Sequence, residues 1–171
     1  MNAAVWVRAL PITVDDEKNM TPTEIRGRAI RVRDTMAKDG IKLRLVVVDY
    51  IQLIDGIKEL HPKATREEGT DHAAQKLVEL ASELDCTVLA LAQLNDDGRI
   101  RNSRAVEMKA DTWIDIDRQD PDKDNYAGVN PVNGAQPARL VLKKQRSGPD
   151  LMVAPCWWYG SYLLFSDEDN L

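Results

Sequence analysis

The hydrophobic pattern of the chain contains two continuous apolar runs, at residues 45–54 and 86–94. The first part of each run has no polar alternation, which is typical of strands buried on both faces of a parallel sheet that helices cover on each side. Between the runs, apolar residues recur at three- and four-residue spacing over residues 70–85, which predicts an amphipathic helix. A strand, a helix and a second strand in this order predict a βαβ unit.

A second helix is predicted before the first run. Thr21, Pro22 and Glu24 have the spacing of a capping box with proline at the first helical position, and one apolar stripe follows until Gly40 ends the helix. Upstream, apolar and polar residues alternate at residues 11–16, which predicts a short strand. The exposed arginines of the helix either contact phosphates or form a solvated face, and the solvated face is the more common case. They are Arg26, Arg28, Arg31 and Arg33.

The rest of the chain is predicted to form irregular segments and antiparallel strands. Residues 55–68 are polar and indicate a loop, and residues 113–117 indicate another strand. Residues 118–137 are rich in Asp, Asn, Pro and Gly and predict an irregular connection, whereas residues 138–166 predict a C-terminal β-hairpin region. We therefore expect a single α/β domain with its core at residues 11–117.

Composition limits the classes of partner. The chain has 171 residues, a net charge of -5 and a pI near 5.1, so nucleic acid would have to be held by local basic clusters and not by bulk charge. Two cysteines without partners at metal-binding spacing favour a reducing compartment, and we expect the cytoplasm. No apolar run has the length of a membrane span, so no membrane association is expected. The basic clusters consist of Arg99, Arg101 and Arg104, and of Lys143, Lys144 and Arg146.

Candidate chemistry lies at the ends of the two apolar strands. Asp49 ends the first strand and Gln93 lies near the end of the second, so both are predicted at the carboxyl edge of the parallel sheet. Ligands bind at this edge in open α/β sheets, and in P-loop nucleotide hydrolases an Asp there holds the magnesium of the triphosphate. Apolar strands that end in Asp are also common in ordinary α/β domains, so this pattern alone leaves both interpretations open.

Several stretches together resemble the C-terminal motor domain of DnaB-type replicative helicases. Four of them occur in the family's order, and they include the Val-Val-Asp-Tyr-Ile-Gln-Leu-Ile run. They are residues 12–33, 47–54, 90–95 and 144–149, with a weaker fifth match at 101–111. The resemblance covers nearly the whole chain and implies an incomplete RecA-like P-loop NTPase core, a parallel sheet flanked by helices, with C-terminal antiparallel strands.

The resemblance also implies roles for individual residues, with ATP and Mg²⁺ as the cofactors. Asp49 matches the Walker B acid, which is a metal ligand, and Gln93 matches the sensor of the terminal phosphate. Lys144 and Arg146 are similar to the cations that such motors insert into the neighbouring subunit's site, which implies a hexameric ring around single-stranded DNA, with primase or a loader as further partners. The DNA-binding loop corresponds to Arg99, Arg101, Asn102, Ser103 and Arg104.

The chain also departs from the family pattern. It contains no G-x-x-x-x-G-K-S/T phosphate loop, and the family's catalytic glutamate, from a segment upstream of residue 12, is missing. We therefore expect weak or absent ATP binding by this chain and a gap in the sheet where the phosphate-loop strand belongs, beside the Gln93 strand. In the DNA loop, Asn102 replaces an acid and Arg104 a glycine, and the loop is short, as in phage-like members.

Three hypotheses follow. The first is a fragment of an ATP-dependent hexameric DNA helicase of the replication fork, whose phosphate loop lies upstream. The second is an ATPase-inactive module that binds DNA or a helicase. The third is an unrelated α/β binding domain. The coding sequence upstream of Met1 separates the first two, since a phosphate loop there supports a fragment and a stop codon supports a stand-alone protein.

Overall fold

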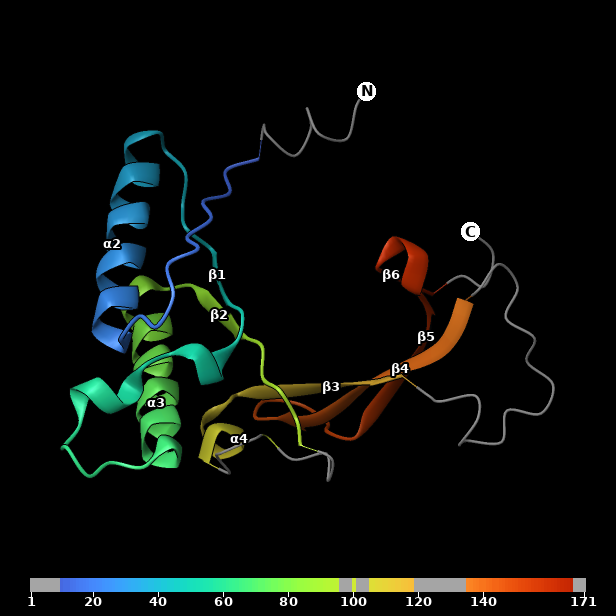
Figure 1. Ribbon diagram of the computed structural model, residues 1–171. Coiled ribbons are helices and arrows are strands. Elements are labelled where there is room, and N and C mark those ends of the chain that lie inside the picture. Colours follow the sequence, from blue (N-terminus) through green and yellow to red (C-terminus); the bar gives the residue numbers. More distant parts are fainter. Residues whose placement is uncertain (1–9, 96–99, 101–104, 119–134, 168–171) are drawn as a thin grey trace. The chain divides into compact units, whose positions relative to one another are not determined.

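The computed structural model describes residues 10–95, 100, 105–118 and 135–167, which form two compact units (Figure 1). The first unit, Met1–Lys109, contains α2 (Pro22–Lys38), β1 (Leu45–Val48), η1 (Ile51–Leu53), η2 (Gly56–Glu59), α3 (Arg66–Leu84), β2 (Thr87–Ala90) and α4 (Ala105–Lys109). The second unit, Ala110–Leu171, contains β3 (Thr112–Arg118), β4 (Ala135–Gln145), β5 (Met152–Tyr159), η4 (Gly160–Tyr162) and β6 (Leu164–Ser166).

The first unit contains the predicted βαβ arrangement. Strands β1 and β2 pair in parallel, with Leu45 opposite Thr87 and Val48 opposite Ala90, and α3 connects them. Helices α2 and α3 lie side by side, and Arg26 of α2 forms an ion pair with Glu83 of α3. The core cluster consists of Ala29, Ile51, Ala74, Leu77, Leu80 and Leu84.

The two parallel strands are covered on one face. Val48 and Val88 pack against the core cluster, whereas Leu45, Val47 and Leu89 on the opposite face are 50%, 55% and 48% exposed. The prediction that the first strand is buried on both faces is therefore wrong for the described part of the chain. An uninterrupted apolar sequence shows that both faces of a strand can be buried, but burial of the second face requires elements that pack against it.

The strand predicted at residues 11–16 is also absent, because these residues have no regular structure. Ile12 and Val14 are 62% and 83% exposed. The segment is tied to α2 by side chains instead, since Arg28 contacts Asp15 at 2.5 Å and Glu17 at 3.2 Å. Alternation of apolar residues forms a strand only where a neighbouring strand supplies hydrogen bonds and side-chain contacts.

Helix α2 begins as predicted, and α3 begins earlier than predicted. Thr21 and Glu24 form the expected capping box. A second capping box joins Thr65 and Glu68, with Thr65 Oγ1 accepting from the Glu68 amide at 3.2 Å, so α3 begins at Arg66 inside the predicted loop. The Thr-x-x-Glu spacing was present in the sequence and is the signal that locates this helix start. None of the helices in the described ranges is long and apolar enough to cross a membrane.

The second unit is a four-stranded antiparallel sheet in the order β3-β4-β5-β6, which confirms the predicted C-terminal antiparallel strands. Strand β4 begins at Ala135, within the segment predicted to be irregular. One sheet face carries the ion pairs Asp115–Lys143 and Asp117–Arg139. Strand β3 pairs with β4, and within the described residues β2 pairs with β1 alone. The gap beside the Gln93 strand stays a prediction. The single domain with a core at residues 11–117 stays a prediction.

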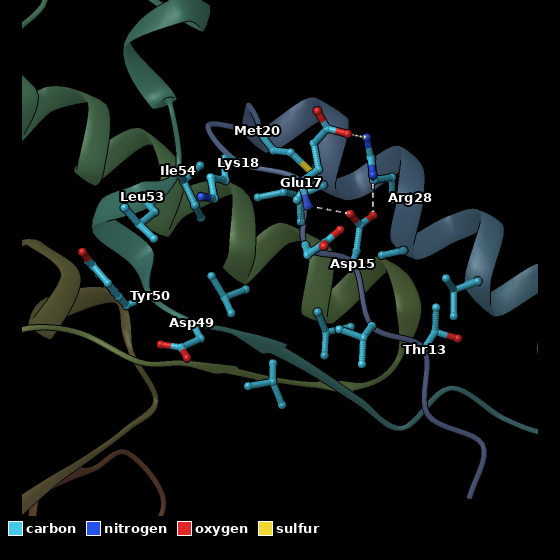
Figure 2. A pocket seen from close by; sticks show the side chains of 18 of the residues that line it. Thr13, Asp15, Glu17, Lys18, Met20, Arg28, Asp49, Tyr50, Leu53 and Ile54 are labelled. Atoms are coloured by element: carbon cyan, nitrogen blue, oxygen red, sulfur yellow. Dashed lines mark hydrogen bonds and ion pairs between the residues drawn. The ribbon is translucent and has the colours of Figure 1, made fainter. Parts of the chain in front are cut away.

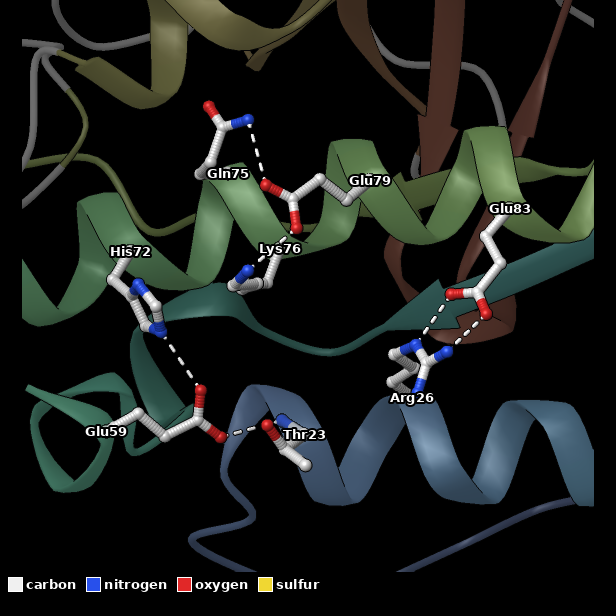
Figure 3. A network of polar contacts seen from close by, with 8 residues as sticks. All are labelled: Thr23, Arg26, Glu59, His72, Gln75, Lys76, Glu79 and Glu83. Atoms are coloured by element: carbon white, nitrogen blue, oxygen red, sulfur yellow. Dashed lines mark hydrogen bonds and ion pairs between the residues drawn. The ribbon is translucent and has the colours of Figure 1, made fainter.

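A polar network joins three elements of the first unit around Glu59 (Figure 3). The Thr23 amide at the start of α2 donates to Glu59 Oε1 at 2.7 Å, and His72 Nε2 of α3 donates to Glu59 Oε2 at 2.9 Å. Burial of Glu59 by itself raises the pKa of its carboxyl group, but the hydrogen bonds from Thr23 and His72 outweigh burial and lower the pKa to about 2. The network therefore stabilises the ionised carboxylate and holds η2 between the two helices.

The Glu59→Gln substitution is expected to make the free energy of unfolding vary less with pH in the acid range. Because the folded-state pKa of Glu59 lies below the ordinary value of 4.5, the carboxylate stabilises the fold fully above pH 4.5, and this contribution is lost as the pH falls towards about 2. The shift of the pKa from 4.5 to about 2 corresponds to a contribution to stability on the order of 2–3 kcal/mol at pH 7. Solvent screens this contribution only in part, because the Glu59 side chain is 18% exposed. Urea unfolding should show this deficit for Glu59→Gln at neutral pH and a much smaller one at pH values well below 4.5.

Glu79→Gln serves as the matched control, because Glu79 lies on α3 and is half exposed beside Lys76. Its deficit should be small at every pH, as for exposed ion pairs in general. A Glu59→Gln deficit that stays the same from neutral to acid pH would contradict the assigned network.

Candidate functional site

Asp49 lies directly after β1, between two hydrogen bonds that hold the strand end in place. The Leu91 amide donates to Val48 O at 2.9 Å, and the Ile51 amide donates to Leu91 O at 2.9 Å. Asp49 and Tyr50 leave the sheet between these two bonds, and the peptide bond that joins them is cis. The Asp49 side chain is exposed at the carboxyl edge of the sheet.

Gln93 lies three residues beyond the end of β2 and is also exposed. Because β1 and β2 are parallel, Gln93 and Asp49 follow strands that end at the same edge. The next residue, Leu94, forms an antiparallel bridge with Ile100, which is 8% exposed. The structure therefore places the predicted acid and the predicted amide at one edge, as the sequence pattern required.

A groove of about 650 Å³ runs along β1 to this edge (Figure 2). Figure 2 shows Asp49, Tyr50 and Leu53 at one end of the groove and Thr13 at the other. Its apolar lining includes Val14, Ile25, Val32, Leu43, Leu45 and Val47, and its acidic lining includes Asp15, Asp16, Glu17 and Asp49. No local sequence pattern reveals the groove, because it is formed by segments that are distant in the chain.

The electrostatics of the groove are dominated by carboxylates, of which Asp15 is neutralised by a neighbour. The hydrogen bond from the Arg28 side chain, followed by that from the Glu17 amide, holds the pKa of Asp15 below its ordinary value. Within the described residues Asp49 forms no ion pair with a cation, so its exposed carboxylate is accessible to a ligand at the sheet edge.

The predicted cations Lys144 and Arg146 belong to the second unit. Lys144 is half-buried in β4, opposite Trp113 of β3. Arg146 lies in the turn after β4, and its side chain is 63% exposed. Its Nη1 contacts Asp111 Oδ1 at 2.5 Å, and its amide donates to Asp111 O at 2.8 Å, so the turn is anchored to the residue before β3.

The predicted DNA-binding residues lie outside the described part of the chain. They are Arg99, Arg101, Asn102, Ser103 and Arg104. Ile100, between Arg99 and Arg101 in the sequence, is described and forms an antiparallel bridge with Leu94.

The described residues fit a magnesium ion that arrives with a nucleotide. Mg²⁺ is commonly held by one or two carboxylates together with phosphate oxygens and water, and Asp49 supplies one exposed carboxylate at the sheet edge. Within the described ranges, no group of three or more His, Cys, Asp or Glu side chains is placed to hold a metal by itself. The phosphates would have to be gripped by residues that this sequence lacks, since it has no glycine-rich phosphate loop.

The parallel strands with helices, and the antiparallel strands that follow, define an α/β protein with a RecA-like ATPase fold. Two solved structures share this fold, each with a TM-score of 0.75 and each aligned with 96% of this chain. One is described as a DnaB-like replicative helicase and its interactions with primase, and it is 20% identical with 40% of its length covered. The other is the ATPase domain of G40P, which is 23% identical with 57% of its length covered.

The chain belongs to the DnaB-like helicase C terminal domain family, whose sequence profile matches residues 1–167. Relatives include the replicative DNA helicase DnaB of Leifsonia xyli, 30% identical over 168 residues, and that of Mycobacterium leprae, 33% identical over 155 residues. These matches cover 92% and 84% of this chain, but only 34% and 23% of the relatives. The chain thus spans about a third and about a quarter of the lengths of these two relatives.

Proposed function

We propose that this chain is part of the motor domain of an ATP-dependent helicase that unwinds DNA at the replication fork as a hexameric ring. The observation that carries the proposal is the presence of Asp49 and Gln93 after adjacent parallel strands, at the edge where nucleotides bind in this class of fold. Membership of the DnaB-like family and the RecA-like fold support it. The proposed setting is the cytoplasm.

The proposed chemistry divides between the two residues. A bound Mg²⁺ would supply positive charge that offsets the charge of the ATP phosphates. Asp49 would hold that ion, directly or through water, from the strand end that the hydrogen bonds to Leu91 hold in place. The Gln93 amide both donates to a phosphate oxygen and accepts from the attacking water, because an amide side chain has both a donor and an acceptor.

Lys144 and Arg146 act in a neighbouring subunit in this proposal. The exposed turn that carries Arg146 supports such a role, because a side chain that completes another subunit's site has to project from the surface. A head-to-tail contact that closes by rotation yields a ring. Arg99, Arg101, Asn102, Ser103 and Arg104 then track the backbone of single-stranded DNA, and primase or a loader docks on the complete helicase.

The experiment that tests the proposal compares this chain with a chain extended upstream through a phosphate loop. The 171-residue chain is expected to show no DNA-stimulated ATP hydrolysis, because nothing in its sequence cradles the β- and γ-phosphates. The extended chain is expected to hydrolyse ATP and to do so faster with single-stranded DNA. ATP hydrolysis by the isolated chain would contradict the proposal that the phosphate-binding half of the site lies in an upstream segment.

The alternative function is an ATPase-inactive module that binds DNA or a helicase, and the missing phosphate loop favours it. This alternative predicts that the isolated chain binds single-stranded DNA or a complete helicase, and that a stop codon precedes its own start signal. An extended chain without turnover would support it.

A further inference from the structure

Beyond β1 and β2, a side chain continues the hydrogen-bond ladder between the two strand ends. The Gln52 amide nitrogen donates to Gln93 O at 3.0 Å, and the Gln93 backbone amide donates to Gln52 Oε1 at 3.3 Å. Gln52 lies in η1 and is half-buried, so its side chain is partly shielded from water. The Gln52 side chain therefore forms hydrogen bonds with both the backbone N–H and the backbone C=O of Gln93.

The geometry reproduces the next rung of a parallel sheet. The preceding rungs are the Leu91 amide to Val48 O and the Ile51 amide to Leu91 O. The next rung would bond the backbone N–H and C=O of Gln93, because in a parallel sheet alternate residues of one strand bond the neighbouring strand and Gln93 lies two residues after Leu91. A carboxamide carries the same donor and acceptor as a peptide group, so Gln52 replaces the backbone that turned away into η1.

We infer that Gln52 is a positioning residue that holds the Gln93 backbone in register with Asp49. Asp49 is flanked by the two bonds to Leu91, and Gln93 is held two residues further along by Gln52. The segment that carries Asp49 and the segment that carries Gln93 are thereby hydrogen-bonded to each other on both sides of the site. The inference rests on the proposed function for its catalytic consequence, whereas the hydrogen bonding of Gln93 is independent of that function.

Positioning matters because, in the proposed function, the Asp49 metal site and the Gln93 amide serve the same bound nucleotide. A shift on the order of 1 Å in a catalytic group lowers turnover by up to roughly a hundredfold. The Gln93 side chain is exposed, and the clamp acts on its backbone, so the residue's side chain stays available to a ligand. Gln52 thus contributes to catalysis through Gln93 and does not contact the substrate itself.

The first arm of the test measures hydrogen exchange of the Gln93 backbone amide by NMR in the 171-residue chain. Gln52→Ala is expected to raise the exchange rate roughly tenfold, because the amide loses its acceptor. Gln52→Glu keeps an acceptor for the Gln93 amide but loses the donor to Gln93 O, so its exchange rate should lie closer to that of the wild type. Gln75→Ala, which removes an exposed glutamine of α3, should leave Gln93 unchanged.

The second arm measures ATP hydrolysis in the extended chain. Gln52→Ala is expected to lower kcat roughly ten- to a hundredfold with little change in KM for ATP, since a misplaced Gln93 affects the transition state more than ground-state binding. Gln52→Glu should recover part of this loss. A residue that only stabilises the fold would lower the melting temperature and leave kcat of the folded protein unchanged.

The arms separate the possible failures. Unaltered Gln93 exchange in Gln52→Ala overturns the clamp. Faster exchange with wild-type kcat overturns the positioning role alone. If the extended wild-type chain hydrolyses no ATP, the proposed function is wrong and the positioning role with it, while the exchange data still decide whether Gln52 holds Gln93.

Discussion

Replacing Arg146 with alanine in the extended chain is expected to lower DNA-stimulated ATP hydrolysis by roughly a thousandfold or more, the usual contribution of an arginine finger. The reason is electrostatic: a guanidinium placed on the transferring phosphoryl group stabilises charge that develops only in the transition state. Its side chain is 63% exposed, so removal should not unfold the second unit. Steady-state turnover with single-stranded DNA measures the effect.

Arg139→Ala is the matched control. Arg139 is an exposed arginine of β4, the strand that precedes the Arg146 turn, and it pairs with Asp117 within the same sheet. Its removal deletes the same charge from the same sheet unit but should leave turnover close to that of the wild type. Equal losses for Arg139→Ala and Arg146→Ala would show that general charge or stability, and not the finger, is responsible.

Asp49→Asn in the extended chain is expected to lower turnover by roughly a thousandfold, which corresponds to about 4 kcal/mol of transition-state stabilisation. An amide has nearly the shape of the carboxylate but lacks the negative charge that Mg²⁺ requires. The substitution should also shift the Mg²⁺ dependence of ATP hydrolysis to higher concentration. Binding of ATP in the absence of Mg²⁺ should be unchanged.

Asp16→Asn controls for the acidity of the groove, because Asp16 lines the same groove from the segment before α2. Only Asp49 follows β1, so the Asp16 variant should retain normal turnover and normal Mg²⁺ dependence. Unchanged ATP hydrolysis by Asp49→Asn would contradict the proposal that Asp49 binds Mg²⁺.

The two variants together test whether the site is shared between subunits. In a head-to-tail ring, an Asp49→Asn subunit still supplies Arg146 to a neighbour that carries Arg146→Ala and an intact Asp49. Mixing the two inactive variants should therefore restore part of the activity. Absence of any recovery in mixed rings would contradict action of Arg146 across the subunit interface.

The features that the sequence predicted correctly are those that depend on neighbouring residues. The Thr21 capping box locates the start of α2, and the apolar runs locate β1 and β2. The order strand, helix, strand was enough to place Asp49 and Gln93 at one edge, because parallel strands end on the same side. The capping box at Thr65 was readable in the same way and was missed.

Tertiary structure decided what depends on a partner elsewhere in the chain. Leu45 and Val47 are apolar enough for burial but are half exposed, and the segment at Ile12 is not a strand, because burial and strand pairing need a neighbouring layer or edge. The bond between Gln52 and Gln93 joins residues 41 positions apart, which no local pattern reveals. The sequence by itself thus determined the elements and the chemistry at their ends, whereas the folded chain determined which surfaces are covered and how Gln93 is held beside Asp49.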